Sequence, residues 1–236
     1  YKAHRPDPPA ELVPQFPLMR DAVRAFGLAP IEQERFEADD IIATYTRQAV
    51  AAGADVTIVS ADKDLMQLVD GKVTFYDPES GIKGKPGYRP ERLLRRDDVI
   101  ERWEGTPPEK IVDVQALTGD STDNVPGAPG IGIKTAAQLI AEYGDLDTLL
   151  ARAHEIKQPK RRETLTNPDI VAQIRISKRL VALEDKVPVA VPLAATTLTA
   201  PDPTRLLAFL KALDFGTLTK RVSETYGADA SAVEPD

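Results

Sequence analysis

The sequence predicts an α/β fold in which a parallel sheet is followed by a mostly helical region. Residues 55–60 form a short, β-branched apolar run, which is typical of a buried parallel strand. Helical periodicity flanks this run and dominates from residue 99 onward. Strands that alternate with helices form layers whose functional groups lie at the carboxyl ends of the strands.

The individual elements follow from apolar spacing and stop signals. Apolar residues at helical spacing and a glycine stop at Gly27 predict the first helix over 15–26. Strands are expected at 31–35, 55–60 and 72–76. Further helices are expected at 36–52, 65–69, 99–103, 108–117, 135–143, 146–150, 168–183, 204–213 and 217–226.

These elements group into three regions. We expect an α/β core over 1–106, a helical region over 107–227, and the start of an interdomain linker over 228–236. Trp103 is expected to be a packing residue. The basic run at 157–162 is interpreted as a solvated charge run, with contact to DNA as the alternative.

Composition narrows the class of protein. The chain has 236 residues, of which 42% are hydrophobic and 28% charged, as in soluble globular proteins. No apolar run approaches the length of a membrane span and no signal peptide opens the chain, so we expect a cytoplasmic protein without a membrane partner. Zero cysteines and two histidines exclude a disulfide framework and argue against zinc.

The negative net charge predicts a metal-binding site rather than a uniformly basic surface for nucleic acid. The net charge is −7, although basic residues cluster at 2–5, 83–102 and 157–162. With 37 acidic residues, any metal should be a hard cation held by oxygen atoms, such as Mg²⁺ or Mn²⁺. A metal-dependent nuclease combines such a carboxylate cluster with basic surroundings.

Three acidic clusters are the candidate metal site, and each has a structural alternative. Acids in a first helical turn oppose the helix dipole, acids after a strand can cap a helix, and acids before a proline can form a turn. To dismiss a metal site, all three structural explanations must be true at the same time, whereas one shared site explains all three acidic clusters. The clusters are Glu37, Asp39 and Asp40; Asp62 and Asp64; and Asp120 and Asp123.

A glycine-rich segment directly follows the third cluster. Gly127, Gly130 and Gly132 precede Lys134 and Thr135, which open an apolar-periodic helix. Closely spaced glycines ahead of a helix let backbone N–H groups approach an anion, although such a segment is by itself often an ordinary loop. Carboxylates beside a phosphate-binding segment indicate a protein that cuts a phosphodiester.

The order and spacing of these blocks resemble the 5′-nuclease (flap endonuclease) family. The matching blocks are Phe36-Glu37-Ala38-Asp39-Asp40, Ala61-Asp62-Lys63-Asp64, Gly119-Asp120-Ser121-Thr122-Asp123-Asn124 and Gly130-Ile131-Gly132-Ile133-Lys134-Thr135-Ala136. The resemblance implies a PIN-like parallel-sheet nuclease core and a helix-hairpin-helix (H3TH) DNA-binding motif. Within the family, the chain is most similar to members that precede polymerase domains, which we therefore expect downstream.

The resemblance also implies residue roles. Two Mg²⁺ (or Mn²⁺) ions would be held by Glu37, Asp39, Asp40, Asp62, Asp64, Asp120 and Asp123, as ligands or direct supports. Lys2 and Arg5, in a segment similar to the family's helical arch, would steady the scissile phosphate. DNA would be bound by Gly127, Gly130, Ile131, Gly132, Lys134 and Thr135.

The implied function is a 5′→3′ exonuclease or flap endonuclease that acts as a monomer in DNA replication and repair. Its substrates would be 5′ flaps and nicked or gapped duplexes. The family carries a further metal-site aspartate on a strand upstream of the segment that begins at Tyr1, so this chain is expected to bind DNA and to cut it poorly. A non-catalytic helix-hairpin-helix module and a PIN-type ribonuclease are the alternatives.

Overall fold

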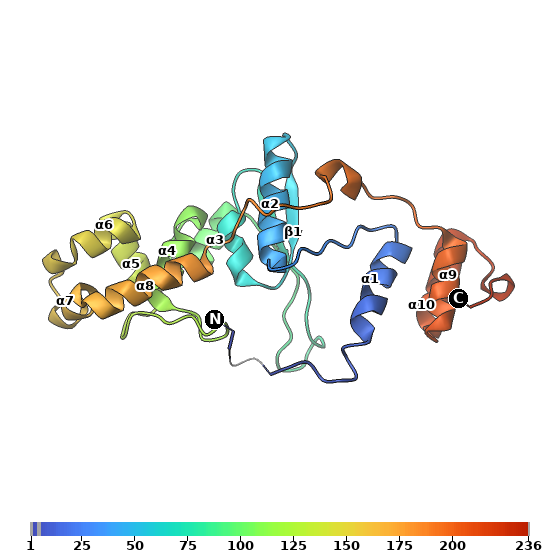
Figure 1. Ribbon diagram of the computed structural model, residues 1–236, viewed down its shortest axis with the longest axis horizontal. Coiled ribbons are helices and arrows are strands. Elements are labelled where there is room, and N and C mark those ends of the chain that lie inside the picture. Colours follow the sequence, from blue (N-terminus) through green and yellow to red (C-terminus); the bar gives the residue numbers. More distant parts are fainter. Residues whose placement is uncertain (1, 4–5, 236) are drawn as a thin grey trace. The chain divides into compact units, whose positions relative to one another are not determined.

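The computed structural model describes residues 2, 3 and 6–235. The chain divides into two compact units, shown in Figure 1. Unit 1 contains residues 35–188 together with the described residues at the start of the chain, and unit 2 contains residues 6–34 and 189–235. The three acidic clusters and the glycine-rich segment all belong to unit 1.

The sheet of unit 1 has three strands in the order β1-β2-β3. Its strands are β1 (Val56–Val59), β2 (Val73–Asp77) and β3 (Arg92–Leu94). β1 and β2 are parallel, which confirms the predicted α/β layer, whereas β3 is antiparallel to β2. The sheet is therefore mixed rather than wholly parallel. The carboxyl ends of β1 and β2 and the start of β3 all lie at one edge.

Two strand predictions were wrong. Residues 31–35 form no strand, because four of the five are polar or charged and the segment has no partner strand among the described residues. β3 was missed, since it has only three residues and lies among charged neighbours, which leaves no apolar run to detect. The predicted strands at 55–60 and 72–76 are confirmed by β1 and β2.

Helices cover the sheet and continue its core. They are α2 (Ala38–Ala51), the 3₁₀ helix η1 (Lys63–Leu68), α3 (Arg96–Arg102), η2 (Pro108–Lys110) and α4 (Ile111–Thr118). One apolar cluster runs from Phe75 on the sheet through Leu65 of η1 to Leu117 of α4, and all three side chains are fully buried. Trp103 is 5% exposed in the same cluster, which confirms its predicted packing role.

A helical part follows α4 along the chain. Its elements are α5 (Ile133–Tyr143), α6 (Leu146–Ala151), η3 (Ala153–Glu155), α7 (Pro159–Thr166) and α8 (Pro168–Val181). α4 packs against both α5 and α8. The basic run that begins at residue 157 leads into α7, where Gln158 caps the helix by accepting the backbone N–H of Arg161 and Leu165 is buried. None of the helices in the described residues could cross a bilayer.

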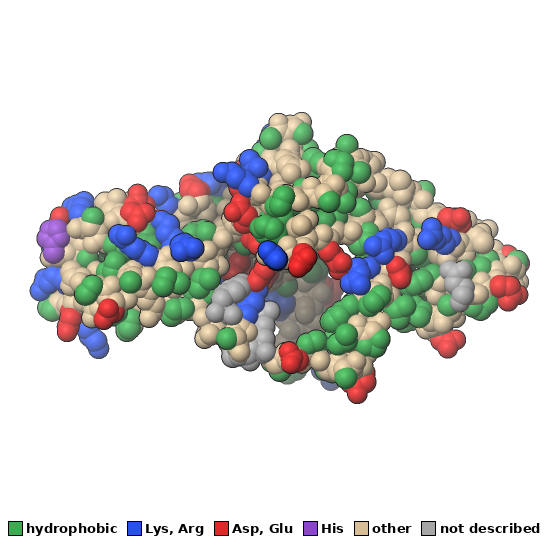
Figure 2. Space-filling model, viewed as in Figure 1, with side chains coloured by type: hydrophobic (Ala, Val, Ile, Leu, Met, Phe, Trp, Pro, Cys, Tyr) green, Lys and Arg blue, Asp and Glu red, His purple; other side chains and the backbone are tan. Residues whose placement is uncertain are grey.

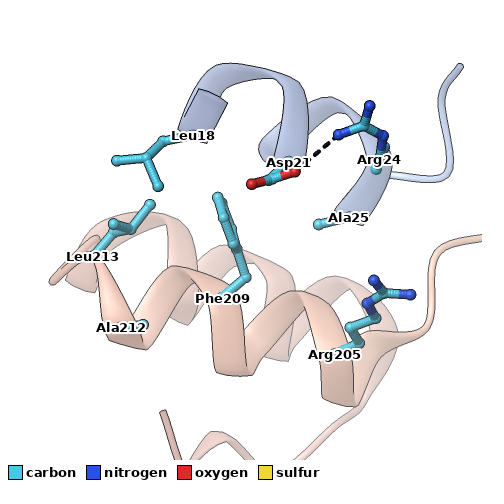
Figure 3. A pocket seen from close by; sticks show the side chains of 8 residues that line it. All are labelled: Leu18, Asp21, Arg24, Ala25, Arg205, Phe209, Ala212 and Leu213. Atoms are coloured by element: carbon cyan, nitrogen blue, oxygen red, sulfur yellow. Dashed lines mark hydrogen bonds and ion pairs between the residues drawn. The ribbon is translucent and has the colours of Figure 1, made fainter. Parts of the chain in front are cut away.

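Unit 2 is a small helical assembly. It contains α1 (Gln15–Ala25), η4 (Leu193–Thr196), α9 (Pro203–Ala212), α10 (Gly216–Tyr226) and η5 (Ala230–Ala232). Leu206, Leu207 and Leu210 of α9 form its buried core with Val222 of α10. Figure 3 shows a groove in which Leu18 of α1 lies opposite Phe209 and Leu213 of α9.

The last residues fold back onto unit 2. Val233 is 9% exposed and packs into the α9–α10 core, while the Lys211 ammonium group donates to the carbonyls of Ala230 and Val233. The segment 228–235, expected to begin a linker, is therefore held against helices in this structure. An apolar residue, Val233, seven places beyond the last predicted helix was the available signal.

Candidate active site

The first acidic cluster begins α2. The Asp40 carboxylate accepts the backbone N–H of Glu37 at 3.2 Å with one oxygen and that of Glu184 at 2.9 Å with the other. Glu37 is the N-cap residue and completes a capping box with Asp40. Asp40 thus fixes the start of α2 to the segment after α8, and both of its oxygens are engaged by backbone groups.

The second cluster lies at the carboxyl end of β1, where the sheet topology places functional groups. Asp62 caps η1 by accepting the backbone N–H of Asp64 at 3.0 Å, and its own N–H donates to the Ser60 hydroxyl at 3.0 Å. The Asp64 carboxylate accepts a hydrogen bond of 2.6 Å from the side-chain amide of Gln115 on α4. This cluster therefore combines a helix cap with an acid held by the helical core.

The third cluster is held by a tight loop after α4. Asp120 and Val125 pair through two backbone hydrogen bonds of 2.9 and 2.7 Å, and Asn124 has φ of 57° in the turn between them. One Asp120 oxygen accepts the N–H of Thr122 at 2.8 Å, and the other lies 2.6 Å from the ammonium nitrogen of Lys63. The loop thus holds Asp120 against the start of η1.

The second and third clusters line one open depression, and the first cluster lies beside it, because the charges of Asp62 and Asp64 act on Asp39. Ala61, Asp62, Lys63, Asp64, Arg102, Asp120, Thr122 and Asp123 line a single open depression. Lys2 joins this depression to the first cluster, because its ammonium group pairs with Glu37 and lies 3.7 Å from an Asp123 oxygen. The Lys2 backbone N–H also donates to the Asp123 carbonyl at 2.9 Å. Arg5, predicted to act beside Lys2, lies outside the described residues.

Crowding shifts the acid equilibria of two carboxyl groups. Burial, followed by the negative charges of Asp62 and Glu37, raises the pKa of Asp39 to about 6. Burial also raises the pKa of Asp64 to about 6, with Asp62 adding to the rise and the Gln115 hydrogen bond opposing it. Asp39 and Asp64 therefore lie in a field of like charge that a cation would relieve.

Lys63 counteracts this field at Asp120. Burial disfavours the charged Asp120 carboxylate, but the hydrogen bond and the positive charge of Lys63 outweigh burial and lower the pKa of Asp120. Burial likewise opposes the charge of Lys63, and the contact with Asp120 raises the pKa of the ammonium group. The two side chains stabilise each other in their charged forms.

The donor set of this site consists of carboxylate oxygens, the ligands that Mg²⁺ and Mn²⁺ prefer. The two carboxyl groups with raised pKa values show that negative charge is concentrated here, which suits a divalent cation. Within the described residues, no three of these side chains surround one point closely enough to hold an ion. Lys2 and Lys63 instead lie between the carboxylates and pair with them.

The glycine-rich segment is anchored between α4 and α5. Gly127 packs against the end of α4 so closely that a Cβ there would lie 2.2 Å from the Thr118 carbonyl oxygen. The Gly127 carbonyl accepts from Gln173 of α8 at 3.0 Å, and Ile131 is 5% exposed. Both residues therefore support the hairpin from inside rather than face solvent.

The exposed part of the hairpin is its tip and the start of α5. Gly130 has φ of 76°, a conformation that favours glycine, and Gly132 is the N-cap residue of α5 without a side chain to cap it. A Cβ at either glycine would meet no atom within 4 Å. The Lys134 side chain is 77% exposed, and Thr135 accepts a 3.5 Å hydrogen bond from Arg161 of α7. This end can approach an anion.

Sequence reasoning missed three residues of the site: Lys63, Gln115 and Arg102. Gln115 is 2% exposed on a helix whose other positions are mostly apolar, so an amide in that pattern was the available signal. Lys63 stands between Asp62 and Asp64 in sequence, and Arg102 is the last residue of the basic cluster at 83–102. Figure 2 shows acidic and basic side chains interspersed over the visible face of the molecule.

Comparison with protein families identifies two matching models. Residues 1–104 match a model described as the N-terminal resolvase-like domain of 5′-3′ exonuclease. Residues 106–204 match a model described as the C-terminal SAM fold of 5′-3′ exonuclease. The two matches follow each other along the chain and together cover most of it.

Curated relatives are bacterial DNA polymerases. The chain is 59% identical over 236 residues to DNA polymerase I of Rhizobium leguminosarum, covering 100% of this chain and 22% of that protein. It is 38% identical over 222 residues to DNA polymerase I of Bacillus caldotenax, covering 94% of this chain and 24% of that protein. The chain therefore spans less than a quarter of the length of these relatives.

Solved structures show the same fold at low sequence identity. T5 5′-exonuclease with bound divalent metal ions (zinc) superposes with a TM-score of 0.61 and 20% identity, over 94% of this chain and 73% of that chain. The catalytic core of Rad2 in complex with DNA substrate superposes with a TM-score of 0.58 and 15% identity, over 90% of this chain and 68% of that chain.

Proposed function

Because the chain belongs to the 5′-3′ exonuclease family, we propose that it hydrolyses DNA phosphodiesters at a 5′ end or at the base of a 5′ flap. The observation that carries this proposal is a depression lined by carboxylates from two separate segments, with Asp39 of a third segment close enough to feel the charges of Asp62 and Asp64. The hairpin that follows the third segment can hold backbone phosphates beside that depression. A site of this kind cuts next to the phosphates that it grips.

We propose Mg²⁺ or Mn²⁺ as the metal, with two ions per site. Asp39, Asp62, Asp64, Asp120 and Asp123 would hold the ions, while Glu37 and Asp40 would support them from the start of α2. When bound, the ions supply an activated water and stabilise the leaving oxygen. Zinc is bound by T5 5′-exonuclease, a protein of the same fold, and the oxygen donors of this chain favour the harder cations.

The protein's own groups would position the substrate. Lys2 lies between Glu37 and Asp123, at the point where a phosphate would meet the carboxylates. We propose that Lys2, together with Arg5, steadies the scissile phosphate. Gly130, Gly132 and Lys134, with Thr135, would grip the duplex through backbone N–H groups and one charge, without reading bases.

The context in a longer protein is also a proposal. The curated relatives are about four times longer than the matched region. We propose that polymerase domains follow this domain in the full-length protein and that it removes primers or damaged strands in the cytoplasm during replication and repair. The substrates would be 5′ flaps and nicked or gapped duplexes, cut by a monomer.

The decisive experiment is a cleavage assay with the purified chain. Substrates of identical sequence are prepared as a 5′ flap, a nicked duplex and a blunt duplex, in DNA and in RNA, and are incubated with Mg²⁺ or with EDTA. We expect slow Mg²⁺-dependent cutting of the DNA flap, detectable at high protein concentration, that Asp62→Ala abolishes. The reaction should release the 5′ strand.

The two alternatives give different results in the same assay. DNA-structure binding without Mg²⁺-dependent cutting, even at high protein concentration, identifies a non-catalytic helix-hairpin-helix module. Preferred cutting of RNA identifies a PIN-type ribonuclease. Either result replaces the proposed function.

A further inference from the structure

A third basic residue faces the carboxylate depression. Arg102 is the last residue of α3 and lines the depression together with Asp62, Asp64 and Asp120. The next residue, Trp103, is 5% exposed in the main core and accordingly fixes the end of α3. The position of Arg102 is therefore set by packing and not by a flexible loop.

Arg102 differs from the two lysines of the site in having no partner. Lys2 pairs with Glu37, and Lys63 pairs with Asp120. Within the part of the chain that the structure describes, Arg102 makes no hydrogen bond or ion pair. Its planar guanidinium group carries five donors in a geometry that matches phosphate oxygens.

A second arginine, Arg92, lies close enough to Arg102 for the two positive charges to interact. Asp77, at the end of β2, is 2% exposed and pairs with Arg92 of β3 at 2.5 Å. Arg92 is thereby held beside Arg102, and the second Asp77 oxygen and the Arg92 Nε are buried without a partner in the described residues. Burial and then the charge of Arg92 lower the pKa of Arg102, while Asp77 opposes this change.

We infer that Arg102 binds a phosphate of the DNA strand next to the bond that is cut, a role that rests on the proposed nuclease function. A phosphate there would pair with the exposed guanidinium group of Arg102, whereas Arg92 already has Asp77 as its partner. The hairpin at 130–135 grips the duplex from another element, so Arg102 adds a separate contact at the carboxylate site. This contact would set which phosphodiester enters the depression.

The test pairs substitutions in the protein with substitutions in the DNA. A 5′-flap DNA is made in versions that each carry one neutral methylphosphonate linkage near the junction. Binding to the unsubstituted chain, Arg102→Ala and Arg102→Lys is measured by fluorescence anisotropy in Ca²⁺. Arg96→Ala is the matched control, because Arg96 lies on the same helix but bonds Glu109 at 2.8 Å.

We expect Arg102→Ala to weaken binding of the all-phosphate flap about tenfold, as for loss of a charged hydrogen bond. One of the methylphosphonate linkages should weaken DNA binding by the unsubstituted chain to a similar degree. The same linkage should leave binding by Arg102→Ala nearly unchanged, because the effects of removing either partner of one contact do not add. Arg102→Lys should recover part of the loss, and Arg96→Ala should bind like the unsubstituted chain. Urea unfolding checks that each variant is folded.

Four outcomes overturn the inference. The effects of Arg102→Ala and of the methylphosphonate on DNA binding could be additive at every linkage, or Arg96→Ala and Arg102→Ala could lose equal affinity. Either result means that Arg102 contributes only general positive charge. Unchanged binding by folded Arg102→Ala removes the contact altogether. If the unsubstituted chain neither binds nor cuts flap DNA, the proposed function falls and this inference with it, whereas the first three outcomes leave the nuclease proposal standing.

Discussion

The ammonium nitrogen of Lys63 lies 2.6 Å from Oδ2 of Asp120, and the Asp120 side chain is only 5% exposed. This pair joins the carboxyl end of β1 to the loop after α4, two segments that are more than fifty residues apart. It therefore connects the sheet with the hairpin that follows the loop. The same pair places a positive charge among the carboxylates that would bind metal.

Lys63→Ala should destabilise the protein in the absence of divalent ions. It leaves a buried Asp120 carboxylate without its charged partner, which we expect to lower the unfolding free energy by about 1–2 kcal/mol. Urea unfolding in EDTA measures the change. Lys72→Ala is the matched control, because the Asp55 partner of Lys72 has a side chain that is 88% exposed and the pair is weak. Equal losses for both variants would contradict a special role for the Lys63–Asp120 pair.

Asp64→Asn should stabilise the metal-free protein at neutral pH. The folded state holds the Asp64 and Asp39 protons up to a pKa of about 6, against an ordinary value of 3.8. As the pH rises from about 4 through 6, both groups must ionise in the folded state and stability falls. Removing one charge should therefore raise the unfolding free energy at pH 7.5 by about 1 kcal/mol after allowance for solvent screening.

The stabilisation by Asp64→Asn should disappear near pH 4.5, where the native carboxyl group is already protonated. Urea unfolding in EDTA from pH 4.5 to 8 gives the profile. Asp55→Asn, at an exposed position, is the control and should produce no such gain. A gain that is independent of pH would show that the Asp64 charge is not its source.

Divalent ions should stabilise the chain by binding the folded state alone. Millimolar Mn²⁺ at pH 7.5 should raise the melting temperature, and EDTA should reverse the rise. The effect should shrink as the pH falls below 6, since protons compete for Asp39 and Asp64. An unchanged melting curve in Mn²⁺, for protein shown to be folded, would argue against convergence of the carboxylates into a metal site.

Two adjacent acids in α2 should respond in opposite ways. Asp40 accepts backbone hydrogen bonds with both oxygens, so Asp40→Ala should lower the unfolding free energy by about 1–3 kcal/mol. Asp39→Asn should not destabilise, because its carboxyl group lies in a field of like charge. Differential scanning calorimetry in EDTA compares them. Equal destabilisation by both would mean that Asp39 also acts as a structural acceptor.

Much of the fold could be predicted because its signals are local. β1 and β2 are β-branched runs, and the helices of both units show apolar spacing with glycine stops. β3 could not be predicted, because three residues carry no periodicity and the strand forms only by pairing with β2. The 31–35 segment shows the converse, since a strand-like run without a partner stays irregular.

In the candidate site, too, only the local features could be predicted from the sequence. Carboxylates in three motifs could be found from sequence. The structure places two of the motifs in one depression and the third beside it, where Lys2 pairs with Glu37. The sequence could not show which carboxylate oxygens remain available for a metal. One Asp40 oxygen, for example, accepts the backbone N–H of Glu184, 144 positions away. Gln115, Lys63 and Arg102 likewise gain their roles only from contacts between distant segments. Sequence spacing cannot state such contacts.

Gly132→Val should separate the stability of the hairpin from its function. A Cβ at Gly132 would meet nothing within 4 Å, and the residue is extended with φ of −93°. The substitution should therefore leave urea unfolding nearly unchanged. If phosphates approach the bare backbone at the start of α5, the added side chain should weaken binding to flap DNA of any sequence.

Lys134→Ala is the companion variant, since the Lys134 side chain is 77% exposed and its pair with Glu104 spans 4.0 Å. It should weaken binding about equally across sequences and reduce the slope of log affinity against log salt by roughly one unit. Fluorescence anisotropy at several salt concentrations measures both variants on flaps of two unrelated sequences. If Gly132→Val binds flap DNA as tightly as the unsubstituted chain does, the hairpin is only a connection between α4 and α5. Unchanged urea unfolding of Gly132→Val would show that a loss of binding does not come from a collapsed hairpin.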